Sequence, residues 1–569
     1  MGRISQFINN LPAQARAVVS TCLYGVSAGG ITVAFELGML GLFNLLYVRH
    51  LFTWKPVPFL AGSLVLLVGI SAFVGWLVNF FQPEAAGGGI AKLKVAFWRN
   101  FGEMPVSVVV VKFFAGIINI GGGGSMGPEG PSAQLGAAMA STLAGGLGEA
   151  KQRRRLPAAA GAAAALAAAF NTPLAAVTFV LEEVINDLNT NLLGAVLLAS
   201  ALGAIVVHLI RGSHPAFAVS TMDDPGWRTN LISPLAALVA AIMGVGFQKC
   251  TLALRARLKS VPAGRAWMKP VVGGLVTWAA GAVVFLTTRR TGVYGIGYED
   301  IQSALQGSFV WEVALLLLAA KFLATSACCG SDGNGGIFAP TLYMGTMCGV
   351  ALAGLAEKFV PLAPASHTAL ALVGMSAFLG AVMRAPVTGI LLVLEMTWDY
   401  SLLPGLMVAA LVSQAVSRTL LKHGFYDAIL EQDGVHLEQV MPPRDLRRWL
   451  AWPVASVANF HPVTVGDFKP ETLRALLDRH TYAYFPVVRE GRLEGVLARA
   501  EMAAALHEAR EPRPATAPAC AASASLREAQ AQLLSSTTNL LLVVENERLL
   551  GLLTLHDLLR AQTNLADQN

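Results

Sequence analysis

Apolar segments follow one another closely over roughly the first 430 residues of the chain. Most approach the about 20 residues that a helix needs to cross a bilayer. Several are shorter or are interrupted by glycine and proline, which lipid tolerates only where protein buries the broken helix ends. This pattern predicts an all-α polytopic membrane protein with broken helices. The apolar runs cover residues 18–48, 57–81, 106–120, 158–181, 192–210, 231–247, 270–287, 310–327, 369–382 and 402–416.

The pattern changes after about residue 431, where charged residues become frequent. Runs typical of strands appear at 483–488 and 540–544, and each is followed by a turn, a second strand-like run and a helical pattern. Two such β-β-α units predict a tandem α/β module. The expected domains are a membrane domain (1–435), a first module (436–507), a Pro- and Ala-rich linker (508–524) and a second module (525–569).

The membrane part also repeats itself. Segment 131–136 resembles segment 340–345, which lies 209 residues further along, and both follow glycine-rich loops. A second pair begins at Pro173 and Pro386, which are 213 residues apart. We therefore expect two repeats, at about 18–212 and 230–425. Internal repeats of this kind are typical of transporters, in which substrate binds at the membrane midplane, at the ends of discontinuous helices.

Composition agrees with this interpretation and excludes others. The chain is 54% hydrophobic and 13% charged, whereas a soluble domain has about 25% charged residues. Its mean hydropathy is +0.57. An ordinary soluble enzyme and a nucleic-acid-coating protein are therefore excluded, although the pI is near 9.0. The net charge of +6 fits cytoplasmic loops rich in Lys and Arg. The six cysteines lack metal-ligand spacing, so we expect no metal or other bound cofactor in the membrane part.

The glycine-rich loops 121–124 and 333–336 each precede the start of a helix. A helix N-terminus carries unpaired N–H groups and the positive end of the helix dipole, so it attracts anions. Glycine lets the backbone approach the ion closely. Two such termini would hold an anion by partial charges, weakly enough for fast transit. The alternative is that both loops are simply flexible connections.

Glu129 lies inside the first loop, where that loop continues through segment 127–131. A carboxylate beside an anion site makes sense as a gate. When ionised it competes with the anion for the site, and when protonated it moves away. The alternative is an ordinary cap of the following helix.

Glu182 and Glu183 end the apolar helix that begins near Pro173. One of them would relay protons from the cytoplasm, or both would lie at a helix end in water. Lys112, Lys321 and Arg384 lie in or beside apolar stretches. They would set a positive potential around the ion path or pair with carboxylates.

Taken together, these motifs resemble those of the CLC family of chloride channels and chloride/proton antiporters. Segment 335–340 matches the family's GxFxP motif, 127–131 its G(K/R)EGP motif, and 83–91 lies where the family has its GSGIP loop. Segment 424–430 resembles the final segment with the anion-binding tyrosine. The tail resembles a cystathionine-β-synthase (CBS) domain pair. The resemblance covers nearly the whole chain.

The resemblance implies an inverted repeat of tilted helices that forms a homodimer with one pore per subunit. It also implies that both termini are cytoplasmic and that the substrates are chloride or a related anion and protons. The Ala-rich composition indicates a bacterial source, so we expect the bilayer to be a bacterial inner membrane. Glu129 would be the external gate and Glu183 the internal proton-transfer residue. The implied anion site consists of Gly88, Gly130, the backbone N–H groups of Ile337 and Phe338, and the hydroxyl of Tyr426.

Three departures from the family pattern bear on function. Gly88 replaces a serine whose hydroxyl helps to bind the anion, so chloride affinity or selectivity should be weaker. Pro128 replaces a basic residue, and Ala91 and Lys92 replace Pro-Glu. The presence of both Glu129 and Glu183 favours a proton-coupled chloride antiporter. The loosened site favours the alternative, a passive voltage- or proton-gated anion channel. A membrane-anchored nucleotide sensor is a third hypothesis.

In the tail, segment 551–557 resembles the ribose-contacting pattern of CBS pairs that bind adenine nucleotides, with Thr554 and Asp557 as the contacting residues. Ala498 stands at the matching place of the first module and lacks the hydroxyl. We therefore expect at most one nucleotide site, or else a purely structural tail.

Overall fold

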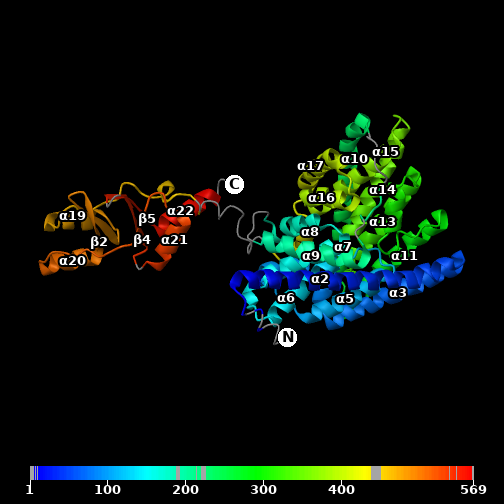
Figure 1. Ribbon diagram of the computed structural model, residues 1–569, viewed down its shortest axis with the longest axis horizontal. Coiled ribbons are helices and arrows are strands. Elements are labelled where there is room, and N and C mark those ends of the chain that lie inside the picture. Colours follow the sequence, from blue (N-terminus) through cyan, green and yellow to red (C-terminus); the bar gives the residue numbers. More distant parts are fainter. Residues whose placement is uncertain are drawn as a thin grey trace. The chain divides into compact units, whose positions relative to one another are not determined.

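The computed structural model divides the chain into two compact units, residues 1–440 and 441–569 (Figure 1). The expected start of the tail at residue 436 adjoins the segment 437–449, which lies outside the described residues, so this boundary stays a prediction. The structure describes residues 6, 8, 10–187, 192–212, 215–219, 226–436, 450, 452–536, 538–545 and 548–566.

The first unit is helical and consists of two successive sets of helices. The first set contains α2 (Ala13–Phe43), α3 (Pro56–Phe81), α4 (Ile90–Arg99), α5 (Val106–Gly121), α6 (Glu129–Gly146), α7 (Arg155–Phe170), α8 (Pro173–Phe179), which continues as the π-helical turn η5 (Val180–Ile185), and α9 (Leu193–Arg211). The second set contains α10 (Gly226–Leu258), α11 (Lys269–Thr288), α12 (Tyr298–Leu305), α13 (Trp311–Gly330), α14 (Phe338–Glu357), α15 (Pro364–Met383), α16 (Pro386–Thr397), α17 (Leu403–Leu420) and α18 (Phe425–Gln432).

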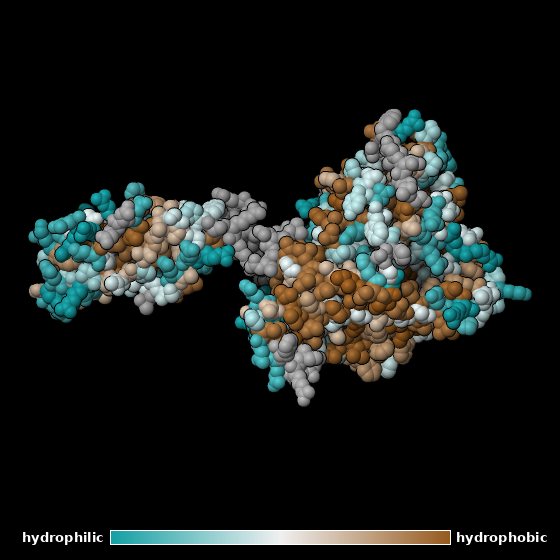
Figure 2. All heavy atoms as spheres, in the orientation of Figure 1, coloured by the Kyte–Doolittle hydropathy of each residue, from teal (hydrophilic) through white to brown (hydrophobic). Residues whose placement is uncertain are grey.

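The surface of this unit is suited to lipid. Within the described residues, nine helical segments are long and apolar enough to cross a membrane. Large apolar side chains point outward, and Leu209 and Leu411 are 82% and 72% exposed. Figure 2 shows hydrophobic residues gathered over the face where Figure 1 places α2, α5 and α9. In water such a surface would be a strong aggregation hazard, so the polytopic membrane protein predicted from the sequence is confirmed.

The two sets of helices repeat one another in their packing. Helix α6 crosses α7 where Gly136 meets Gly161, and α14 crosses α15 where Gly345 meets Gly374. At all four glycines a Cβ atom would come within about 2.5 Å of the opposing glycine's carbonyl oxygen. The helix backbones therefore touch directly in both repeats. The crossing glycines are 209 and 213 residues apart, the offsets found in the sequence.

The second unit contains two β-hairpins of the same design, as the sequence predicts. In the first, β1 (Tyr484–Arg489) pairs antiparallel with β2 (Arg492–Ala498), and α20 (Arg499–Glu508) follows. In the second, β4 (Leu540–Glu545) pairs antiparallel with β5 (Arg548–Thr554), and α22 (Leu555–Ala566) follows. Each hairpin has its register shift at the same place, in the middle of its first strand. Helices α19 (Pro470–Arg479) and α21 (Leu526–Ser535) precede the two hairpins.

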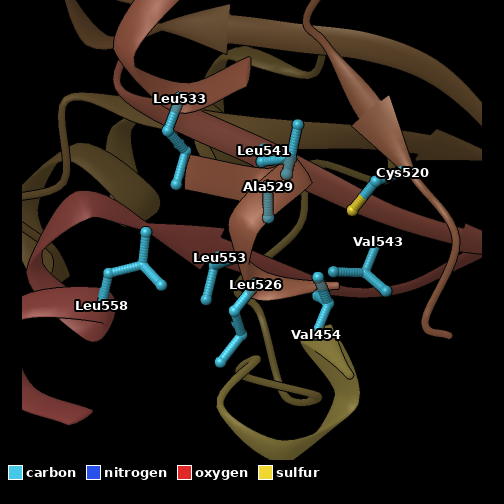
Figure 3. Packing of buried hydrophobic residues seen from close by; sticks show 9 residues of the cluster. All are labelled: Val454, Cys520, Leu526, Ala529, Leu533, Leu541, Val543, Leu553 and Leu558. Carbon is cyan, nitrogen blue, oxygen red and sulfur yellow. The ribbon is translucent and has the colours of Figure 1, made fainter. Parts of the chain in front are cut away.

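A strand, β3 (Ala519–Cys520), lies within the stretch that we expect to be the linker, and it pairs in parallel with β4. The short helix η9 (Val454–Ser456) also belongs to the second module, since Val454 lies in the same buried cluster as Val543 and Cys520 (Figure 3). A second cluster joins the two modules, because Val496 of β2 packs with Leu540 and Leu542 of β4. Among the residues that the structure describes, the second module's core contains Val454, Cys520, Leu526, Ala529, Leu533, Leu541, Val543, Leu553 and Leu558.

Candidate functional site

The loops that precede α6 and α14 pair with each other. The Gly127 N–H donates to the Gly336 carbonyl at 2.8 Å, and the Gly336 N–H donates to the Gly127 carbonyl at 2.6 Å. The two glycines are 209 residues apart, so they occupy the same place in the two repeats. This pair of hydrogen bonds holds the N-termini of α6 and α14 at one point within the unit. Both helix ends thus present their unpaired N–H groups to the same region.

Gly130, in the first turn of α6, lies where three loops meet. A Cβ atom at this position would come 2.1 Å from the Gly88 carbonyl oxygen and 3.2 Å from the Gly336 Cα. These neighbours are backbone atoms, so they cannot turn aside as a side chain would. Only a glycine at position 130 allows the loop that precedes α4 to approach α6 and α14 this closely.

Two buried lysines fix the loops before the short helices α4 and α12. Lys112 Nζ donates to the Ala85 carbonyl at 3.0 Å. Lys321 Nζ donates to the carbonyls of Gly292 and Gly295 at 2.9 and 2.7 Å. The two lysines are 209 residues apart and hold equivalent loops. Buried ammonium groups need such partners, because leaving them unpaired in an apolar interior is very costly.

Arg384, the third cation considered in the sequence, also donates hydrogen bonds to backbone carbonyl groups. Its guanidinium donates to the carbonyls of Ser417 and Leu421 at 3.0 and 2.5 Å. The three cations therefore donate to carbonyl groups, and Arg384 also to the Ser417 hydroxyl, rather than to the carboxylates that the sequence allows as partners. They act as cross-links between backbone segments.

The Glu129 side chain is fully buried and lies at the N-terminus of α14. The Tyr298 hydroxyl donates to its Oε1 at 2.9 Å, and the Ala339 N–H donates to its Oε2 at 3.4 Å. Ala339 is the second residue of α14, so one carboxylate oxygen takes the position that suits an anion at a helix N-terminus. Glu129 is also the first residue of α6, but its carboxylate is directed at the other repeat.

Three of the residues expected to bind an anion line one cavity of about 230 Å³: Gly88, Ile337 and Tyr426. Phe338 follows Ile337 as the first residue of α14 and is buried, with its ring 4.9 Å from that of Phe179. A Cβ atom on Gly88 would meet only a carbonyl oxygen at 3.4 Å, so the space where the family has a serine is open.

Charged side chains also line this cavity. Arg255 pairs with Asp433 at 3.0 Å and with Asp332 at 3.5 Å. Burial opposes ionisation of Asp433, but the hydrogen bond from Lys259 and the nearby Arg255 outweigh it and hold the pKa of Asp433 below its ordinary value. Lys92 lines the same cavity, and it has no ion pair within the part of the chain that the structure describes. It adds positive charge to the wall of the cavity that Tyr426 also lines.

The structure gives the side chains of Glu182 and Glu183 different surroundings, whereas the sequence leaves both as candidates for the proton relay. Both lie in the π-helical turn η5. Glu182 faces α16, where its Oε2 accepts from the Thr388 N–H at 2.9 Å and from the Thr388 hydroxyl at 2.8 Å. Glu183 turns inward, with its side chain 9% exposed, and its Oε1 lies 2.9 Å from Lys94 Nζ. Glu183 is therefore the buried carboxylate, and Glu182 caps a helix.

The cap formed by Glu182 has a counterpart in the other repeat. Glu395, near the end of α16, accepts from the N–H groups of Leu174 and Ala175 at 2.9 and 2.7 Å, and these groups begin α8. Each of the two helices thus caps the start of the other. Both begin with a proline, which has no N–H group, so the caps reach the next two residues.

In the second unit, Thr554 and Asp557 line a cavity of about 380 Å³ together with Tyr482, Thr538 and His556. Asp557 Oδ2 accepts from the Thr554 N–H at 2.9 Å and from the Thr554 hydroxyl at 2.6 Å. This contact ties the first turn of α22 to Thr554, the residue that precedes the helix. Both residues named from the sequence therefore lie at the wall of one cavity.

The sequence does not single out three of the residues found here: Tyr298, Lys94 and Asp427. Tyr298 could have been found from the repeat, because it begins α12 after a glycine-containing loop, 208 residues beyond Ile90, which begins α4. Lys94 and Asp427 give no comparable signal. They are 333 residues apart, and only folding brings them together.

Comparison with known proteins agrees with this architecture. Residues 70–418 match the family described as voltage gated chloride channel, and residues 515–564 match the CBS domain. The H(+)/Cl(-) exchange transporter ClcA of Vibrio parahaemolyticus is 28% identical over 452 residues, which cover 75% of this chain and 92% of that protein. The ClcA protein of Vibrio campbellii is 31% identical over 381 residues, which cover 65% and 79%.

Solved structures show the same fold. A slow cyanobacterial Cl-/H+ antiporter superposes with a TM-score of 0.65 at 24% identity, covering 73% of this chain and 97% of that one. A eukaryotic CLC transporter superposes with a TM-score of 0.61 at 20% identity and covers 95% of this chain and 97% of its own. The chain therefore belongs to the CLC family of integral membrane proteins. It carries a CBS domain in its tail, and the resemblance found in the sequence is confirmed.

Proposed function

We propose that the protein is a proton-coupled chloride antiporter. The observation that carries this proposal is the position of the Glu129 carboxylate, which accepts a backbone N–H at the start of α14. An ionised glutamate there competes directly with an anion. The names of its relatives, H(+)/Cl(-) exchange transporters, support the same function.

Exchange follows because the Glu129 carboxylate and the transported anion compete for one binding position, at the N-terminus of α14. Ionised Glu129 occupies the N-terminus of α14 with the help of the Tyr298 hydroxyl. A proton removes its charge, so the carboxyl group loses its attraction to the helix dipole and withdraws. An anion then takes its place and moves on to the cavity beside Ile337 and Tyr426, where backbone N–H groups and the Tyr426 hydroxyl hold it. When the anion leaves through this cavity, Glu129 releases its proton to the external side and returns in its ionised form.

Glu183 supplies the proton from the internal side, by a route separate from the anion cavity. It is buried, it belongs to a cluster separate from that of Glu129, and it sits in a π-helical turn, a distortion that is frequent at functional sites. The anion and the proton would therefore approach by different routes and meet only at Glu129. Separate routes allow two ions to move in opposite directions through one subunit.

Glu183→Gln tests this function. The amide keeps the shape of the side chain but cannot carry a proton, so proton flux in proteoliposomes should fall by about a hundredfold. Anion flux should persist, because Glu183 lies outside the anion cavity. Chloride efflux and internal pH are recorded together under a chloride gradient. Glu357→Gln, which removes an exposed carboxylate at the end of α14, is the matched control and should leave both fluxes unchanged.

The unmutated protein decides between the two transport mechanisms. An outward chloride gradient should drive protons uphill. Chloride flux without proton movement would instead identify a passive channel, which the missing hydroxyl at Gly88 favours. Nucleotide binding with no anion flux at all would leave the sensor hypothesis.

We also propose that the protein is a homodimer in a bacterial inner membrane, with both termini cytoplasmic. The bacterial relatives support the location. The basic residues of segment 151–155, between α6 and α7, support a cytoplasmic position for that connection. The dimer rests on the family resemblance alone.

We propose further that the cavity beside Thr554 and Asp557 binds an adenine nucleotide. Its volume of about 380 Å³ suits a ligand of that size. Calorimetric titration of the full-length protein with ATP should show one site per chain, and Asp557→Asn should weaken binding about tenfold through loss of a charged hydrogen bond. Asp478→Asn, an exposed position on α19, is the control. An absence of heat with unmutated protein would leave the tail structural.

A further inference from the structure

We propose that Lys94 and Asp427 form the inner end of the proton route, with Asp427 taking a proton from water and Lys94 passing it to Glu183. This inference rests on the proposed function, in which Glu183 carries protons. It adds two residues that neither the sequence motifs nor the comparisons assign to transport. It also states the order in which they act.

Three ionisable groups meet here from three distant segments. Lys94, on α4, lies with its Nζ 2.9 Å from Glu183 Oε1 in η5 and 2.5 Å from Asp427 Oδ1 in α18. The ammonium group therefore bridges two carboxylates that do not bond each other in the structure. These three groups are far apart in the sequence, so they come into contact only when the chain is folded.

Exposure differs sharply between the two ends of this line of residues. The side chains of Glu183 and Lys94 are 9% and 4% exposed, whereas that of Asp427 is 47% exposed. Only Asp427 is open enough to exchange protons freely with water. A proton that reaches Glu183 along these contacts must pass Lys94, because Lys94 lies between them.

The charge of the cluster leaves room for one added proton. Two ionised carboxylates and one ammonium give these three groups a net charge of minus one, which the nearby Arg384 offsets only from outside the chain of contacts. Binding of a single proton makes the cluster neutral. The surrounding structure holds it in place, since the Trp98 Nε1–H donates to the Val184 carbonyl at 3.0 Å and thereby fixes the turn that carries Glu183.

The transfer balances without any further reactant. Asp427 takes a proton from water and becomes a carboxylic acid. The Lys94 ammonium gives a proton to the Glu183 carboxylate and becomes a neutral amine for a moment. It then takes the proton of Asp427, so that Lys94 is again charged, Asp427 is again ionised and Glu183 carries the proton.

A simpler role for Lys94 is to hold Glu183 in place by charge alone, and Lys94→Arg separates the two roles. Arginine keeps the charge and the donors but stays protonated in proteins, so it cannot act as a relay. If Lys94 passes the proton, proton flux falls by about a hundredfold while anion flux continues. If proton flux survives in this variant, Lys94 only positions Glu183 and the relay is wrong.

Asp427→Asn gives a second test that does not depend on fitting a larger side chain. It should lower proton flux roughly tenfold, since water reaches the rest of the cluster only poorly, and Asp427→Glu should restore it. Glu431→Gln is the matched control, because Glu431 lies one turn further along α18 and is 48% exposed, like Asp427. Equal proton fluxes in Asp427→Asn and Glu431→Gln would overturn the intake role of Asp427.

All variants are measured as full-length protein in proteoliposomes, with chloride efflux and internal pH recorded together. The unmutated protein separates this inference from the proposed function. If it moves no protons, the proposed function fails. If it moves protons and both Lys94→Arg and Asp427→Asn move them equally well, the function stands and only the relay fails.

Discussion

Glu129→Gln is expected to abolish proton movement while anions still cross the membrane. The amide has the size of the carboxyl group but carries neither a negative charge nor an exchangeable acid proton. It no longer competes for the N-terminus of α14, where Glu129 Oε2 accepts from the Ala339 N–H. Anion flux should therefore persist, and proton flux should fall by at least about a hundredfold. Chloride efflux and pH in proteoliposomes measure the two quantities separately.

A graded variant sharpens this test. Tyr298→Phe removes the hydroxyl that donates to Glu129 Oε1 but leaves the carboxylate. We expect a smaller effect, because the loss of one hydrogen bond to a charged group costs about 2 kcal/mol. Proton coupling should weaken without disappearing. Proton flux that continues undiminished in Glu129→Gln would mean that another group carries the proton, and the gate would have to be placed elsewhere.

Gly130→Ala is expected to disrupt the junction of the three loops, although it adds only one methyl group. That group would lie 2.1 Å from the Gly88 carbonyl oxygen, so the loop before α4 must move away. Overpacking of this kind commonly costs about 1–3 kcal/mol, and more where backbone must move. We expect lower thermal stability and at least a roughly tenfold loss of anion flux, since Gly88 lines the anion cavity.

Gly30→Ala is the control for this variant. Gly30 lies in α2, and a Cβ atom there would meet nothing within 4 Å. Alanine also favours a helix more than glycine does. Stability and flux should therefore be kept. If Gly130→Ala behaves like Gly30→Ala in both measurements, the close approach of the loops has no role in transport.

Much of this architecture can be predicted from the sequence because it depends on local patterns. Apolar runs indicate membrane helices, and the offsets of 209 and 213 residues indicate the repeat. The glycine-rich loops mark the broken helix ends, since a close backbone approach needs glycine. Turn residues between strand-like runs define both hairpins of the tail. The short helices α4 and α12 cannot be predicted from apolar runs, because they are too short and too polar to form them.

The partners of buried charges could not be predicted. The sequence shows that Lys112 stands among apolar residues, but not that its ammonium binds carbonyl groups. It shows two adjacent glutamates, but not that Glu182 faces a helix end while Glu183 faces Lys94. The direction of a side chain depends on the π-helical turn and on segments hundreds of residues away. No spacing rule contains that information.

The exchange of caps between α8 and α16 has a consequence for how the two halves fit together. Glu182 of the first half caps the second, and Glu395 of the second half caps the first. The glycine loops also bond in both directions. The halves therefore meet as two copies of one subunit do in an isologous interface, where each side offers the same patch. A single half-length chain with these features would be self-complementary, able to complete the junction with a second copy of itself.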